Sequence, residues 1–168
     1  VLRWGHMQHH VHTGDPKLDP DYPTAHSFGG LAWRGFFWGD VYYIWNYLKH
    51  QKERPAREVT VVRRHLLIGG IIFVVAGITL PIEAFIFWVI ASRLTLWMIA
   101  LVFMYLPHLP HTVKQKDAPY QATLMRMGMS WLMTPLLAYQ NYHLVHHLYP
   151  TVPFYRYKKV WDARKEFH

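Results

Sequence analysis

The fold is decided by one apolar stretch, residues 66–106, which reads LLIGGIIFVVAGITLPIEAFIFWVIASRLTLWMIALVFMYL. Within this stretch only Glu83 and Arg93 carry charge, whereas the segments on either side are polar and rich in Lys, Arg and His. Its 41 residues suffice for two helices of about 20 residues each, the length that crosses a bilayer. Because Pro81 would interrupt a single helix, we predict a transmembrane hairpin with spans near residues 62–80 and 85–106.

Charge around the hairpin indicates its orientation. The net charge is +8, and basic residues bracket the apolar stretch at residues 49–64 and 114–116. Such bracketing is typical of loops on the cytoplasmic side of a membrane. Nucleic acid is not the favoured partner of this positive charge, because no nucleic-acid-binding motif accompanies it. Arg93 falls inside the second span, where a charge is costly unless paired, and we expect its partner in a part of the protein that precedes this sequence.

The rest of the chain is predicted to be helical, giving an all-α membrane protein with interfacial and cytosolic helices. We expect one partial domain over residues 1–168, N-terminally truncated because a motif begins within a few residues of Val1. It divides into residues 1–30, 31–61 (an aromatic helix in the membrane interface and a basic link), 62–106 (the hairpin) and 107–168. An amphipathic core helix is the alternative for residues 31–53. A further helix is expected over 118–142, despite Pro135, and a basic amphipathic helix at the C-terminus.

Two histidine clusters carry the chemistry. The first is His6-Met-Gln-His9-His10 and the second is His143-Leu-Val-His146-His147, one on each side of the hairpin in sequence. On a helix, positions i, i+3 and i+4 share one face, so each cluster presents three imidazoles to a common point. The chain has no cysteine, which excludes thiolate sites. Two such clusters predict a site for a pair of metal ions, although imidazole also suits zinc, copper and nickel. Solvated or pH-sensing histidines are the alternative.

These motifs resemble those of a known family. HMQHHVHTGDPKLDPD at residues 6–21 resembles the second histidine box of the membrane fatty acid desaturase superfamily, and QNYHLVHHLYP at residues 140–150 resembles the third. The resemblance implies a di-iron centre that uses O₂ and electrons from an external donor such as a ferredoxin or cytochrome-type protein. Matching the boxes residue by residue gives iron ligands at His6, His9, His10, His143, His146 and His147. The first box of the family has no counterpart here.

Other polar residues are candidates for supporting roles. His111 is a candidate for an additional ligand, and His108 is a weaker one. Ligating imidazoles commonly donate their second N–H to a carboxylate, a role open to one of the aspartates near the first box. Turn formation at Asp-Pro is the alternative for these aspartates. The candidates for residues that support the ligands are Asn141, His12, Asp15, Asp19 and Asp21.

The functional expectation is an O₂-dependent oxidation of a membrane lipid. A fatty-acyl chain, desaturated or hydroxylated, is the first choice, and ring hydroxylation or ketolation of a carotenoid is the alternative. A non-catalytic membrane metal-binding or transport protein is a further alternative, disfavoured because the spans contain few polar residues. A soluble zinc hydrolase is a weaker alternative, because no Glu stands beside a His pair as a general base.

Overall fold

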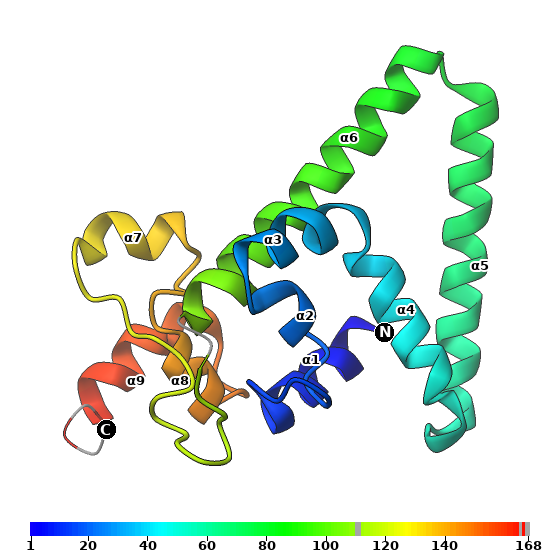
Figure 1. The fold of residues 1–168 in the computed structure, drawn as a ribbon. Coiled ribbons are helices and arrows are strands. Elements are labelled where there is room, and N and C mark those ends of the chain that lie inside the picture. The colour runs from blue at the N-terminus through cyan, green and yellow to red at the C-terminus, as the bar shows by residue number, and fades with distance from the viewer. Residues whose placement is uncertain (110–111, 165, 167–168) are drawn as a thin grey trace.

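Two long helices form the hairpin that the apolar stretch predicts. α5 (Ala56–Thr79) rises to a turn at Leu80 and Pro81, and α6 (Ile82–Ile99) returns (Figure 1). Leu80 is extended because the following proline disfavours a helical conformation, and Pro81 then precedes the first turn of α6. Both helices are long and apolar enough to cross a membrane, and only 6% of each apolar window is buried. A core helix of a soluble protein would be largely buried, so these exposed side chains suit contact with lipid.

The hairpin is closed at its tip and open at its base. Near the turn, the ring of Phe73 lies 5.3 Å from that of Phe85 and 5.9 Å from that of Trp88. Towards the base the two helices diverge, and α4 (Gly39–Lys49) lies between them (Figure 1). α4 is bonded to both helices, through Asp40 to Arg93 on α6 and through the Tyr47 hydroxyl to Glu58 on α5. It therefore fixes the separation of the two helices at the base.

The remaining elements lie at the base of the hairpin. The structure describes residues 1–109, 112–164 and 166, and within these ranges it has helices and one isolated bridge between Met125 and Tyr142 but no strand. This confirms the all-α prediction. The elements before α4 are α1 (Leu2–His12), α2 (Tyr22–Ala25), α3 (Phe28–Gly30) and a π-helical turn at Leu31–Gly35. After α6 come a π-helical segment (Ala100–Tyr105), a 3₁₀ turn (Leu106–His108), α7 (Ser130–Leu136), α8 (His143–Leu148) and α9 (Tyr157–Arg164).

A close approach joins the first helix to the aromatic segment. The Cα of Gly5 on α1 faces the ring of Tyr43 on α4, so a methyl group at residue 5 would clash with that ring. A second small core at the other end of the base consists of Tyr142, Val145 and Tyr157, which join α8 to α9. These two contacts hold α1 and α8 in place below the hairpin.

Several expected boundaries were wrong. The basic link ends at Pro55, and α5 begins at Ala56 because that proline can precede a helix while Glu58 is favourable in its first turn. The aromatic segment is broken near Trp38, so that only Gly39–Lys49 forms a regular helix. The helix expected over 118–142 is reduced to Ser130–Leu136, because Met129 before it and Ala138 and Tyr139 after it adopt the left-handed conformation.

The prediction that Arg93 pairs with a residue that precedes this sequence was also wrong. Its guanidinium forms a bidentate ion pair with Asp40 of this chain, with nitrogen–oxygen distances of 2.9 and 2.7 Å. Both side chains are partly exposed, Arg93 to 27% and Asp40 to 35%. The pair compensates the charge of Arg93 within the apolar helix α6 and attaches the start of α4 to α6.

We predict that Asp40→Asn lowers the free energy of unfolding by about 1–2 kcal/mol, because it leaves the Arg93 charge unpaired; partial exposure keeps the loss below that of a buried pair. Thermal unfolding in detergent, followed by tryptophan fluorescence, measures the change. The matched control is Asp162→Asn, which breaks the exposed pair with Lys158 and should have little effect. An equal midpoint for both variants would show that α4 is not attached through Arg93.

Candidate metal centre

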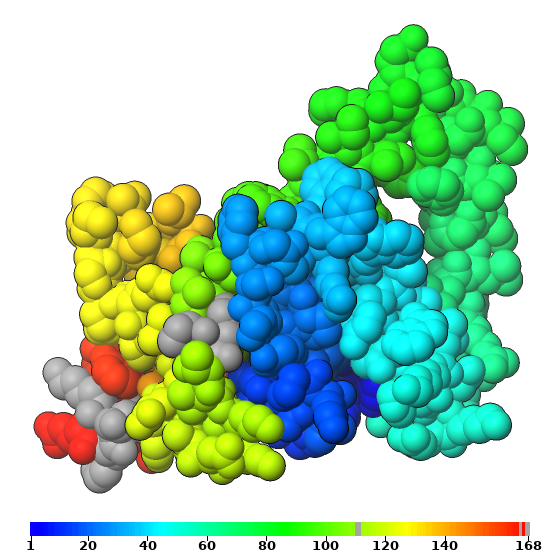
Figure 2. Space-filling model, in the orientation of Figure 1, coloured from blue at the N-terminus to red at the C-terminus, as the bar shows by residue number. Residues whose placement is uncertain are grey.

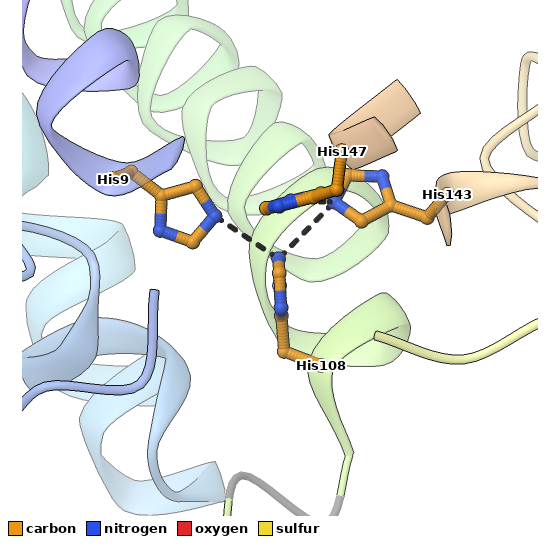
Figure 3. Close-up of side chains that lie close together, drawn as sticks. All are labelled: His9, His108, His143 and His147. Carbon is orange, nitrogen blue, oxygen red and sulfur yellow. Dashed lines mark hydrogen bonds between the residues drawn. The ribbon is translucent and has the colours of Figure 1, made fainter. Parts of the chain in front are cut away.

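Seven histidines meet below the base of the hairpin in two groups. The four-histidine group consists of His9, His108, His143 and His147, and all four are buried. The three-histidine group consists of His6, His10 and His146. Within each group, one ring nitrogen of every residue lies within 4.8 Å of the others. In Figure 3 the four rings of the first group approach from three separate segments and turn their tips toward one point.

Each histidine box divides its side chains between the two groups, instead of presenting all three to one point. On α1, His9 belongs to the four-histidine group and the pair His6 and His10 to the other. On α8 the division is reversed, since the pair His143 and His147 joins the four-histidine group. The i, i+4 pair lies on one helical face and the i+3 residue is turned aside, so a single helix can reach two adjacent points. The rings of His10 and His147, one from each group, stack with centroids 4.3 Å apart.

In the four-histidine group every ring has its second nitrogen, Nδ1, on a hydrogen-bond acceptor. The Nδ1 of His9 donates to Asp19 at 2.9 Å, and that of His108 lies 3.3 Å from the Ala122 carbonyl oxygen. The Nδ1 atoms of the α8 pair reach glutamine side-chain oxygens, His143 to Gln140 at 2.5 Å and His147 to Gln115 at 2.7 Å. These acceptors place the ring proton on Nδ1, which leaves the lone pair of each Nε2 facing the centre of the group.

The aspartates after the first box form a buried network with His9. Asp19 accepts from His9 and from the Gly14 and Asp21 backbone N–H groups, each at 2.9 Å. Asp21 accepts a hydrogen bond from the Tyr43 hydroxyl, and its other oxygen lies 3.5 Å from Nδ1 of His9. Burial raises the pKa of Asp21 to about 6, against the opposing effect of His9. Burial alone would lower the pKa of His9, but the carboxylates of Asp21 and Asp19 outweigh it and raise that pKa.

Four of the other histidines favour the neutral form. Burial, with the neighbouring histidines, lowers the pKa of His10 to about 3 and that of His146 to about 4. The same causes bring the pKa values of His143 and His147 well below the usual range. Since only the neutral ring has a free lone pair, these shifts favour the form that binds a metal.

The three-histidine group has a different support. The Nδ1 of His146 lies 2.8 Å from the hydroxyl of Tyr157 on α9, and burial raises the pKa of that hydroxyl. Within the described residues, the buried Nδ1 of His10 has no hydrogen-bond partner. His146 is therefore the ring of this group whose orientation a second side chain fixes, and α9 contributes to the site through it.

The spacing of the inner nitrogens fits a bound cation. The Nε2 atoms of His9 and His143 each lie 3.1 Å from that of His108, and in the other group that of His10 lies 3.1 Å from His6 and 3.0 Å from His146. Nitrogens at this distance can share an N–H···N hydrogen bond, or they can direct their lone pairs at one bound metal ion. Within each group the inner nitrogens are therefore close enough to bind one metal ion.

An apolar cavity of about 930 Å³ adjoins the histidines. His6, His9, His143 and His146 form part of its wall. Apolar side chains from the hairpin and α4 form much of the remainder, among them Ile44, Leu66, Leu96, Ile99, Ala100 and Phe103. The cavity thus joins the metal-binding groups to the membrane-crossing part of the chain.

The remaining candidates from the sequence are placed as follows. Asp15 pairs with Lys114 at 3.0 Å and caps the turn at Lys17, so it joins two loops instead of orienting a histidine. Asn141 is fully buried and donates to Thr134 at 3.1 Å. Among the described residues, His12 belongs to neither histidine group. His111 lies outside the described residues.

Sequence reasoning ranked one residue too low and missed several others. His108 lies within the four-histidine group, although it was the weaker candidate; its position after Pro107, at the end of the second span, was the available signal. The supporting residues Gln115, Gln140 and Tyr157 were not anticipated. Gln140 precedes His143 by three residues, but nothing in the sequence singles out Gln115 or Tyr157.

Comparison with known proteins agrees with this site. The family described as fatty acid desaturase matches residues 1–167, which is almost the whole chain. Neither a curated protein nor a solved structure matches it. The match includes both histidine boxes, His108 and the hairpin, and together with the two exposed apolar helices it supports a location in a membrane. The chain therefore belongs to the fatty acid desaturase family.

Proposed function

We propose that this protein is an O₂-dependent oxidoreductase that holds two iron ions in its two histidine groups and oxidises a fatty-acyl chain of a membrane lipid. The observation that carries the proposal is that both groups border one apolar cavity at the base of the hairpin. Family membership supports the reaction class. Desaturation and hydroxylation both belong to this class of oxidation.

The two groups would hold one iron each. His9, His108, His143 and His147 would bind the first, and His6, His10 and His146 the second. The inner nitrogens of each group are close enough to bind one ion, and imidazole ligands suit iron among other metals. When bound, the iron supplies the activation of O₂ without which an unactivated C–H bond cannot be oxidised.

The protein residues determine where and on what this chemistry acts. Asp19, Gln140, Gln115 and Tyr157 hold individual rings in the orientation that faces the centre. The apolar cavity wall excludes water and leaves room for a hydrocarbon chain, whose C–H bonds it brings beside His6 and His146. A hydrocarbon dissolved in the membrane can enter such a cavity without leaving an apolar environment.

We also infer the side of the membrane and the source of electrons. The histidine groups lie at the base of the hairpin, the end where Arg63 and Arg64 precede the apolar part of α5. The positive-inside tendency supports the cytoplasmic side for this end.

Because oxidation with O₂ consumes two electrons from outside the site, a ferredoxin or cytochrome-type donor is required. The basic surface favours an acidic donor.

We predict that the purified protein contains two irons per chain, and that His108→Ala retains about one, because it removes a ligand from the four-histidine group only. Elemental analysis of iron and zinc measures both values. The control is His65→Ala, since His65 is exposed on α5 and should leave the iron content unchanged. One zinc per chain, or equal metal loss in both variants, would contradict the assignment.

Tyr157→Phe should weaken retention of the second iron about 10-fold or more, because it removes the hydrogen bond that orients His146. The phenyl ring keeps the packing with Tyr142 and Val145. Iron loss to a chelator is measured over time, with Tyr155→Phe as the control because Tyr155 is exposed. Unchanged retention would remove Tyr157 from the site.

Expression in a host that makes both fatty acids and carotenoids, together with a suitable electron donor, tests the substrate. We expect a new double bond or hydroxyl group in the fatty-acyl fraction. His146→Ala should abolish the product without loss of membrane insertion. Modified carotenoids with unchanged fatty acids would reject the fatty-acyl assignment and favour ring oxidation.

A further inference from the structure

α7 and the residues around it form an apolar projection that the metal site does not use. Residues 127–155 contain no Asp, Glu, Lys or Arg, although the chain as a whole has 28 such residues (18 basic and 10 acidic). Large apolar side chains are exposed on and beside α7, with Trp131 exposed to 78% and Leu136 to 65%. Met127, Met129 and Leu132 are exposed as well. A patch of this kind marks a surface that another apolar phase covers.

The backbone holds this patch away from the rest of the protein. Met129 precedes α7 with φ of 48°, and Ala138 and Tyr139 follow it with φ of 46° and 65°. Side chains other than glycine rarely adopt this left-handed conformation, so the two turns that delimit α7 are specific features of the fold. Figure 2 shows the α7 region, in yellow, as a separate projection at the upper left.

The projection lies on the membrane side of the protein. In Figure 1, α7 stands above α8 and α9, in the direction in which α5 and α6 extend, and at about the level of α3. The α3 region also exposes large apolar residues, Phe28 and Trp33. A bilayer that surrounds the hairpin therefore extends sideways toward α7.

We propose that α7 lies in the membrane interface as a second, non-spanning anchor, with Trp131 and Leu136 inserted among the lipid chains. The absence of charge over residues 127–155 suits insertion, because no charged group needs to be removed from water. Tryptophan also favours the headgroup boundary, where its ring is in apolar surroundings and its N–H can reach water. The hairpin already fixes a bilayer at this level, so lipid is the occupant that needs no additional partner.

This anchor is directly connected to the histidine site. Thr134 on α7 accepts a hydrogen bond from Asn141, just before α8, at 3.1 Å. Ala138, in the turn after α7, and Gln140 both line the apolar cavity, and Gln140 supports His143. Insertion of α7 would thus hold α8 and one side of the cavity at the membrane surface.

The absence of cysteine allows a direct test in the full chain. Leu136→Cys provides a single labelling position for a small environment-sensitive fluorophore, and the protein is reconstituted in phosphatidylcholine vesicles. Quenching by nitroxide-labelled lipid reports contact with the acyl chains, and quenching by iodide reports contact with water. Phe87→Cys on α6 is the lipid-exposed reference, and Lys116→Cys is the water-exposed reference.

We expect the label at residue 136 to be quenched by nitroxide lipid several-fold more than the label at 116, approaching that at 87, and to be poorly quenched by iodide. Trp131→Cys should give the same result and serves as an independent reporter. Strong iodide quenching at both positions would overturn the proposal in favour of a solvent-exposed helix. Protection from both quenchers would overturn it in favour of a protein cover, such as a second copy. None of these readouts depends on iron or on oxidation of a substrate.

Discussion

Seven imidazoles meet in two small spaces, and burial together with their proximity favours the neutral form of most of these rings. His9 is the exception, because the carboxylates of Asp21 and Asp19 raise its pKa. Protonated rings at such distances would repel each other, and burial opposes their charged form, which is why the pKa values of His10 and His146 are so low. The Nε2 atoms then lie as close as 3.1 Å to one another, with lone pairs that a metal ion could share. Much of the fold around the site follows from this constraint. The loop after α1 supplies Asp19, the segment after the hairpin supplies Gln115, and α9 supplies Tyr157, each as a partner for the outer nitrogen of a ring.

The division of each box between the two groups links the two groups to one another. α1 contributes to both groups, and α8 does so in the reverse proportion. A shift of either helix therefore changes the arrangement of the imidazole rings in both groups. His108 contributes to only one group, but it does so from the end of the segment that leaves the membrane-crossing α6. The separation of the hairpin from the helices below it is thereby linked to the four-histidine group.

Local features of the fold and site could be predicted from sequence, whereas contacts between distant segments could not. The hairpin follows from the apolar stretch and Pro81, and the helical boxes follow from i, i+3 and i+4 spacing, so both were anticipated. Gln115 and Tyr157 contact His147 and His146 across 32 and 11 residues, and no periodicity predicts such contacts. Likewise, Arg93 was recognised as a charge that needs a partner, but Asp40 lies 53 residues away on another helix. The helix expected over 118–142 proved too long, because left-handed residues on both sides confine α7 to seven residues.

The contacts that hold α4 between the two hairpin helices also determine where the apolar cavity opens. The Arg93–Asp40 pair fixes the start of α4 against α6, and the bond between Tyr47 and Glu58 fixes its other end against α5. With α4 between them, the two helices diverge at the base, and the apolar cavity opens in that region beside His6 and His143. Had the helices packed along their whole length, Leu66 on α5 and Leu96 on α6 could not line a shared cavity that also reaches the histidines. An ion pair within the membrane zone is thus the contact that leaves room for a lipid next to the metal-binding groups.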